Sequence, residues 1–280
     1  MLAVRPHPDD ESSATGGLLA YYHARGIRTG VVICTGGEEG EIHDPALDAV
    51  ADKSRLRAIR EREVREACAI LGVSHLRFLG YRDSGMPDTA ANAHPEAFCQ
   101  ATLDAAVGRL AHIIRELRPL VMVTDPPGGG YAHPDHLMCH RVSVAAFHAA
   151  GDAQAYPDAG PAWQVSKLYA VVHIDDGAWE ALRPEFKAAG FDFGRRRTRR
   201  RGPAPETTTV ALDVQPYSAI QRRALLAHRT QIPAGSLWAR LPDDLYRRAF
   251  ATTYCLRLHP PAASGEREPD LYSGLTEYGV

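Results

Sequence analysis

The side chains that could do chemistry in this sequence gather first in the motif His-Pro-Asp-Asp-Glu at residues 7–11. His7 and Asp10 are three positions apart, and on a helical or turn-like segment such residues share one face. An imidazole and a carboxylate on one face can together hold a divalent cation. Asp9 would point away from that pair by about 100°, so it would lie beside the cation without having to be a ligand.

A second motif, Gly-Gly-Gly-Tyr-Ala-His-Pro-Asp-His, occupies residues 128–136 and repeats the His-Pro-Asp pattern. His133 and His136 have the same spacing of three, and Pro134 suits the first position of a helix. We therefore expect His133 at the N-cap of a helix and His136 in its first turn.

His7, Asp10 and one histidine of the second motif would form a His₂Asp ligand set that leaves a position for water, as in catalytic zinc sites. Such nitrogen and oxygen donors also suit iron, cobalt or manganese. Asp9 can then take a proton from the water on the metal. The remaining histidine, oriented by Asp135, can protonate a leaving amine, and Tyr131 can donate to an oxyanion.

Simpler interpretations exist for each motif. A single His-Pro-Asp is usually a turn, but two copies, each after an expected strand, favour a metal site. The acidic stretch Gly-Glu-Glu-Gly-Glu at 37–41, which includes Glu39, is either a solvated loop or part of the rim of the site. Arg60 and Glu63 by themselves suggest an exposed helical salt bridge, and Arg-Asp-Ser-Gly-Met at 82–86 suggests a turn.

The composition is that of a globular protein. The chain has 280 residues and a formal net charge of −2, so no overall field attracts nucleic acid or membranes. No apolar run approaches the ~18 residues of a membrane span, and the N-terminus lacks a signal-peptide pattern. The five scattered cysteines favour reduced thiols. The arginine-rich run at 195–201 lacks interleaved aromatic residues, which favours a solvated loop. We expect a cytoplasmic protein, with a homo-oligomer possible, that binds neither nucleic acid nor membranes.

Short apolar runs alternate with helical patterns through the first half of the chain. Strands are expected at 2–4, 29–35, 75–80 and 120–124, and helices at 16–26, 56–72, 97–117 and 134 to about 150. This alternation predicts an α/β fold of Rossmann-like type, with a mostly parallel sheet and helices on both faces. Both His-Pro-Asp motifs follow strands, at the carboxyl edge of the sheet where such folds bind ligands.

The second half of the chain is less regular. Strands are expected at 167–174, 209–214 and 252–258, and a helix at 219–232. We expect residues 1–165 to form a Rossmann-like catalytic core with the metal site. Residues 166–280 would form a smaller C-terminal α+β part that completes the substrate pocket, within one continuous domain.

Four motifs together resemble the PIG-L/LmbE-like family of metal-dependent N-acetylglucosamine deacetylases, namely those at 7–11, 34–41, 82–86 and 128–136. The likeness covers residues 2–150. Beyond them, the main segment that resembles the family is Ala-His-Arg-Thr-Gln at 227–231. Within the family, the sequence is most similar to enzymes of low-molecular-weight thiol pathways. These are the deacetylase of mycothiol synthesis, mycothiol conjugate amidase and bacillithiol-type deacetylases.

The resemblance implies a role for each residue of the two main motifs. The Zn²⁺ ligands would be His7, Asp10 and His136, and the general base would be Asp9. His133, supported by Asp135, would stabilise the tetrahedral intermediate and protonate the leaving amine, and Tyr131 would assist at the oxyanion.

The resemblance also implies contacts with the substrate, a small N-acetylated amino-sugar glycoside. Arg60 and Asp83 fall where related enzymes hold the sugar and its aglycone, and Glu39 on the expected rim is a third candidate. The family usually opens with Ala-His-Pro-Asp-Asp, whereas Arg5 and Pro6 precede His7 here.

We therefore expect a zinc-dependent enzyme that removes the acetyl group from an N-acetylglucosaminyl glycoside in low-molecular-weight thiol metabolism. The alternatives are an amidase that cleaves a larger thiol–sugar conjugate and a non-catalytic sugar-binding module with a structural metal. A structural site would more often be closed by four protein ligands, so three ligands and a spare acid favour the enzyme. The sequence leaves the aglycone open among inositol, malate and chito-oligomer glycosides.

Overall fold

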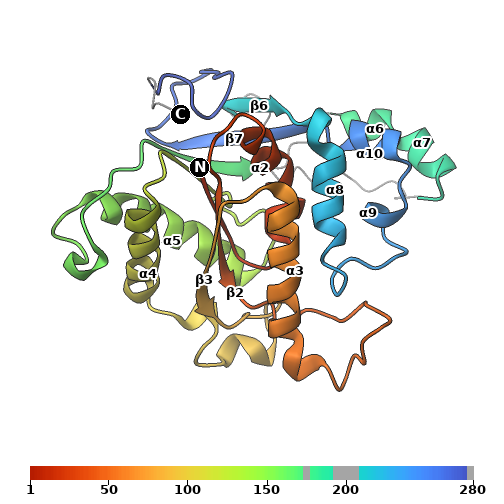
Figure 1. Cartoon of the computed structure of the whole chain (residues 1–280), viewed down its shortest axis with the longest axis horizontal. Coiled ribbons are helices and arrows are strands. Elements are labelled where there is room, and N and C mark those ends of the chain that lie inside the picture. Colours follow the sequence, from red (N-terminus) through yellow and green to blue (C-terminus); the bar gives the residue numbers. More distant parts are fainter. Residues whose placement is uncertain (173–176, 192–207, 276–280) are drawn as a thin grey trace.

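A computed structural model describes residues 1–172, 177–191 and 208–275 (Figure 1). The arginine-rich run at 195–201 lies outside the described residues. None of the described helices has the length and apolar character needed to cross a bilayer.

A seven-stranded sheet forms the centre of the molecule. Its strands are β1 (Leu2–Arg5), β2 (Gly30–Thr35), β3 (His75–Tyr81), β4 (Val121–Thr124), β5 (Lys167–Val172), β6 (Val210–Asp213) and β7 (Thr252–His259). They lie in the order β3-β2-β1-β4-β5-β7-β6. Among the described strands β7 is antiparallel to both of its neighbours, β5 and β6, and the other neighbouring pairs are parallel. The predicted α/β fold with a mostly parallel sheet is confirmed. The division of the chain at residue 165 stays a prediction.

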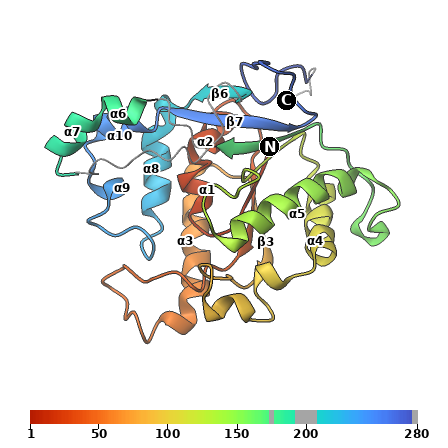
Figure 2. The same cartoon turned by 180° about the vertical axis from the view of Figure 1, so that it is seen from behind.

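Helices cover both faces of the sheet (Figures 1 and 2). On one face lie α2 (Gly16–His23), α3 (Leu56–Leu71) and α8 (Ser218–Leu226), and on the other lie α4 (Leu103–Leu117) and α5 (Pro134–Gly151). Each face buries its own apolar cluster, which explains the near-continuous apolar runs of the central strands. Because helices cover both faces of the sheet, a functional site is expected in the loops at the ends of the strands.

Shorter helices complete the fold. The first motif runs into α1 (Asp10–Ser13). Four others lie together beside α8, namely α6 (Ala178–Ala181), α7 (Arg183–Ala188), α9 (Leu237–Arg240) and α10 (Asp243–Ala249) (Figure 1). A small third cluster that includes Phe186, Leu241 and Tyr246 connects α7 with α10 and the segment before it.

Capping residues explain where the helix boundaries differ from expectation. The helix expected at 97–117 begins only at Leu103, because the Thr102 side chain accepts the Ala105 N–H at 3.3 Å and caps it. The residues before it form a separate 3₁₀ turn at Phe98–Gln100. The helix expected at 219–232 ends at Leu226, and the residues after it bind other elements.

The C-terminal end of α5 is held by a buried arginine of α4. The Arg115 guanidinium donates, at 2.7–3.2 Å, to the carbonyl oxygens of Ala149, Ala150, Asp152, Ala155, Tyr156 and Gly160. Only 3% of Arg115 is exposed. Four of these oxygens also accept a backbone N–H, so Arg115 mainly joins the end of α5 and the loop after it to α4.

We predict that Arg115→Met lowers the free energy of unfolding by about 3 kcal/mol, because it removes a buried guanidinium whose hydrogen bonds join α4 to the end of α5 and the loop after it. Urea denaturation measures this change. Arg141→Met, on an exposed position of α5, is the control and should change stability by less than about 0.5 kcal/mol. Equal losses in the two variants would contradict a specific role for Arg115.

Candidate active site

The topology brings four loops together at the carboxyl edge of the sheet. The first motif follows β1 and the second follows β4, and these strands are direct neighbours. The acidic stretch at 37–41 follows β2, and residues 82–86 follow β3. Because β3, β2, β1 and β4 are consecutive in the sheet, all four motifs meet where the strand order reverses, which is the usual ligand site of such folds.

Three of the expected side chains form a group that could bind a metal ion. In His7, Asp10 and His136, the possible ligand atoms lie within 4.8 Å of one another. Asp10 Oδ2 is 3.3 Å from His7 Nδ1 and 3.6 Å from His136 Nε2. His136 Nε2 is buried and has no hydrogen-bond partner among the described residues. A buried polar atom of this kind points to a missing partner, and the mixed nitrogen and oxygen donors fit a divalent transition metal.

A second layer of residues orients His136. Its Nδ1 lies 3.2 Å from Asp125 Oδ2, and Asp125 Oδ1 lies 2.9 Å from Arg5 Nη1. This contact has an ion-pair distance but not the geometry of a hydrogen bond, since His136 Nδ1 and Asp125 Oδ2 both lack a hydrogen-bond partner among the described residues. A proton on Nδ1 beside this carboxylate would leave the lone pair of Nε2 toward Asp10, as in the common carboxylate–histidine–metal arrangement. Asp125 was not predicted as a site residue, although its position directly after β4 lies at the same edge of the sheet. Arg5 stood out in the sequence only as a departure from the family's usual opening.

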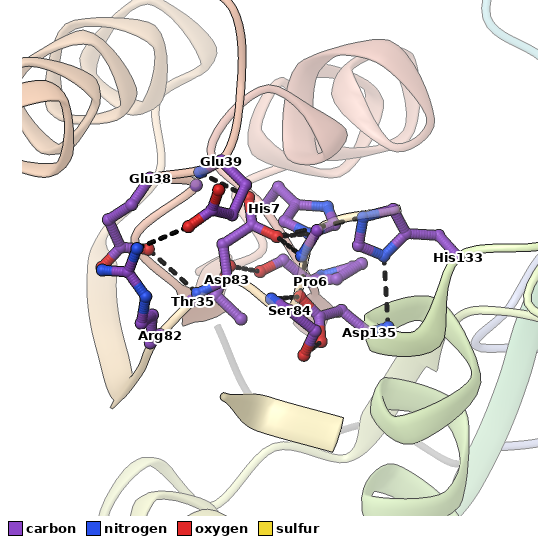
Figure 3. A network of polar contacts seen from close by, with 12 residues as sticks. Pro6, His7, Thr35, Glu38, Glu39, Arg82, Asp83, Ser84, His133 and Asp135 are labelled. Carbon is purple, nitrogen blue, oxygen red and sulfur yellow. Dashed lines mark hydrogen bonds and ion pairs between the residues drawn. The ribbon is translucent and has the colours of Figure 1, made fainter. Parts of the chain in front are cut away.

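His7 faces two groups of acids through its two ring nitrogens. Whereas Nδ1 faces Asp10, Nε2 lies 3.2 Å from Asp135 Oδ2 and 3.6 Å from Asp83 Oδ1 (Figure 3). Burial opposes a charge on His7, but its contacts with these acids outweigh burial and raise the pKa of His7 well above its ordinary value. A proton and a metal ion therefore compete for this ring.

Asp83 and Asp135 belong to a second compact group with His7 and His133, whose ligand atoms also lie within 4.8 Å of one another. Here Ser84 fixes the Asp135 carboxylate, donating to it from its backbone N–H at 2.9 Å and from its hydroxyl. Ser84 is a further residue that the sequence analysis did not single out.

Asp9 lies beside the ligand group and is not part of it. Its Oδ2 accepts a hydrogen bond from Arg60 Nη2 at 3.0 Å. Burial raises the pKa of Asp9 to about 6, although Arg60 opposes this rise. The carboxylate can therefore accept a proton near neutral pH, as a general base must.

Arg60 is buried and binds the segment that carries Asp9. Besides Asp9, its guanidinium donates to the carbonyl oxygens of Pro8 and, at 2.7 Å, of Gly37. Gly37 has a φ of +69°, and a Cβ there would lie 2.3 Å from Arg60 Nη1, so only glycine fits. The exposed salt bridge considered for Arg60 and Glu63 is wrong, because both side chains are buried and Glu63 binds Thr230.

His133 caps α5 as expected, and the cap fixes its tautomer. The Asp135 backbone N–H donates to His133 Nδ1 at 3.2 Å, so in the neutral ring the proton is on Nε2. Burial, followed by the neighbouring His7, lowers the pKa of His133 to about 4. Asp135 thus orients His133 through its main chain, while its carboxylate faces His7.

The other expected residues lie around this centre. Tyr131 is 44% exposed, and its ring centroid is 4.5 Å from that of His136. The Glu39 backbone N–H donates to Asp83 Oδ2 at 3.3 Å, and its carboxylate pairs with Arg82 (Figure 3). The acidic stretch after β2 is therefore bonded to the rim of the site. The substrate contacts expected of Arg60, Asp83 and Glu39 stay predictions.

Comparison with known proteins shows which family the chain resembles. Residues 2–147 match the sequence profile of PIG-L, described as GlcNAc-PI de-N-acetylase. The 1D-myo-inositol 2-acetamido-2-deoxy-alpha-D-glucopyranoside deacetylase of Acidothermus cellulolyticus is 40% identical, over 98% of this chain and 94% of the relative. The enzyme of the same name from Thermobifida fusca is 39% identical, over 97% and 96%. The likeness therefore extends well beyond the matched profile.

Solved structures show the same fold. N,N'-diacetylchitobiose deacetylase from Pyrococcus horikoshii has a TM-score of 0.64 and 18% identity, over 94% of this chain and 83% of that chain. The 4-carboxy-2-hydroxymuconate hydratase GalB from Pseudomonas putida has a TM-score of 0.63 and 18% identity, over 94% and 97%. Because enzymes with different names share the architecture, the fold by itself does not fix the reaction.

We predict that Asp125→Asn weakens metal binding by roughly 10- to 100-fold, because the amide no longer fixes the ring of His136. Competition with a chelator of known affinity, followed by elemental analysis, measures this change. His136→Ala should lose the bound metal altogether, whereas Asp158→Asn, at an exposed position, is the control and should retain it. Full metal affinity in Asp125→Asn would show that Asp125 does not orient the ligand.

Proposed function

This chain belongs to the PIG-L family, and we propose that it removes the acetyl group from the N-acetylglucosamine of a GlcNAc-inositol glycoside with the aid of a zinc ion. The observation that carries this proposal is the 39–40% identity to GlcNAc-inositol deacetylases over nearly the full length of both chains. The products are acetate and a free amine, which agrees with the expected place in low-molecular-weight thiol metabolism.

His7, Asp10 and His136 would hold the metal ion. The unpartnered His136 Nε2 and the set of two imidazoles and one carboxylate support zinc, and iron, cobalt or manganese would also suit these donors. When bound, the ion supplies Lewis-acid polarisation of the amide carbonyl and of the attacking water.

The proton transfer is assigned to Asp9, and charge stabilisation is assigned to His133. Asp9 takes one proton from the water as the water oxygen bonds to the amide carbon, and the bond from Arg60 keeps the Asp9 carboxylate in place. The Nε2–H of the neutral His133 donates a hydrogen bond to the oxygen on which negative charge develops. Because loss of that proton would leave an imidazolate, Asp9 gives the proton taken from the water to the nitrogen as the C–N bond breaks, which restores the Asp9 carboxylate.

Tyr131, Asp83, Glu39 and Arg60 are proposed to hold the substrate. Burial raises the pKa of Tyr131, so its hydroxyl stays protonated and can donate to the carbonyl oxygen. Asp83 Oδ1 lies 3.9 Å from His133 Nε2, which supports a role for this carboxylate as an acceptor for sugar hydroxyls. Glu39 and Arg60 lie on the β2 side of the same cluster.

A panel of N-acetylglucosaminides, assayed for released amine with each added metal, tests the proposed substrate. The panel contains the free sugar, a chito-oligomer, the malate glycoside, the inositol glycoside and a larger thiol–sugar conjugate. We expect the inositol glycoside to exceed the others in kcat/KM. A higher rate on the conjugate would favour the alternative amidase, and amine release from none of them would favour a sugar-binding module.

We predict that Asp9→Ala retains its metal but loses roughly 10²- to 10⁴-fold in kcat, because no other side chain replaces the general base. Steady-state assays on the inositol glycoside, with elemental analysis of the same sample, measure both quantities. Turnover close to that of the unmodified enzyme would remove Asp9 from the mechanism.

A further inference from the structure

Glu11 and His228 form a buried pair that the proposed reaction does not use. Glu11 lies in α1, and His228 follows α8, which packs against α1 (Figure 2). Both residues are 0% exposed, and His228 Nε2 lies 2.7 Å from Glu11 Oε1. A fully buried pair joining segments more than 200 residues apart needs a reason, since burying charged groups is costly.

The other oxygen of Glu11 binds the backbone of the proposed general base. The Asp9 N–H donates to Glu11 Oε2 at 2.9 Å. Asp9 has a φ of +117°, a conformation that residues with a side chain rarely adopt and that persists only when the surroundings stabilise it. This hydrogen bond is such a stabilising contact.

The contacts of Glu11 and His228 hold the Glu11 carboxylate rigidly. The Ser12 hydroxyl donates to Glu11 Oε1 at 2.5 Å, so both oxygens of the buried carboxylate have partners. The 2.7 Å contact between His228 Nε2 and Glu11 Oε1 lies wholly inside the protein, so the pair keeps Glu11 in one position.

Asp9 is thus held from two sides. Arg60, on α3, binds its carboxylate at 3.0 Å, and Glu11, braced by His228, binds its backbone amide. Neither Glu11 nor His228 belongs to the metal-binding groups, and neither is accessible to a substrate.

We propose that Glu11 and His228 are positioning residues that hold the left-handed backbone of Asp9 and so aim its carboxylate at the attacking water. This proposal rests on the function proposed above, in which Asp9 is the general base. It also assigns a role in the reaction to the segment at 227–231 of the C-terminal half.

The first test compares single variants. In Glu11→Gln the amide keeps the shape of the side chain, but its one oxygen cannot accept from both Asp9 and His228 with full strength. We expect kcat to fall by roughly 10- to 100-fold, with KM and metal content unchanged. His228→Leu should lose a similar factor, and His228→Gln, which retains a donor, should recover part of it.

A double-mutant cycle separates positioning from a general structural effect. If Glu11 acts through Asp9, then Glu11→Gln should change the residual kcat of Asp9→Ala by less than about twofold. An equal fold-loss in both backgrounds, or a loss of metal in Glu11→Gln, would overturn the proposal. If Glu11→Gln fails to fold, the same cycle is made with His228→Gln.

Thr230→Val is the matched control. Thr230 is also buried in the 227–231 segment, but its hydroxyl binds Glu63 at 2.6 Å and not the segment of Asp9. This variant should lower the melting temperature and leave kcat within twofold. If Asp9→Ala is inactive while Glu11→Gln and His228→Leu are fully active, positioning fails and the proposed function stands. If Asp9→Ala is itself fully active, both fail.

Discussion

The structure depends on the burial of several carboxylates around one point, which is unfavourable unless each acid has a partner. Like charges in a shielded site repel each other strongly. The chain supplies specific donors: Arg5 pairs with Asp125, Ser84 binds Asp135, and the Gly85 backbone N–H binds Asp83 at 2.8 Å. In the group of His7, Asp10 and His136 the buried Nε2 of His136 has no hydrogen-bond partner among the described residues, and a divalent cation would fit the donors of this group.

The parallel strands of the N-terminal half position the residues of the site. Residues of the C-terminal half bind the segments that carry these residues and so stabilise them. Three residues within the four positions 228–231, just after α8, bind three different N-terminal segments. His228 binds Glu11, Thr230 binds Glu63 of α3, and the Gln231 side chain donates to the Glu41 carbonyl oxygen at 2.9 Å. The helix predicted for 219–232 ends early because these residues turn toward the site.

The sequence predicted the sheet and the central residues of the site because both depend on local patterns. Period and spacing identify strands, helices and the two His-Pro-Asp motifs without knowledge of distant contacts. Asp125, Arg5 and His228 were missed as functional residues because their partners are distant in sequence. Arg60 and Glu63 were recoverable, since they share the i, i+3, i+4 positions of Leu56, Ile59, Val64 and Ala67 on the buried face of α3. A charged residue on the apolar face of a helix indicates that a buried hydrogen-bond or ion-pair partner exists elsewhere in the fold.

A deacetylase and a hydratase share this fold, so the reaction has to be inferred from the side chains at the site. Amide hydrolysis needs a group that carries a proton from water to the nitrogen, and a donor for the oxygen that becomes negative. Asp9, whose pKa is raised by burial, and His133, whose proton is on Nε2 because of the helix cap, are the residues proposed for these two roles. The helix cap that defines the second motif therefore determines which nitrogen carries the proton, so a local rule of helix formation becomes part of the chemistry.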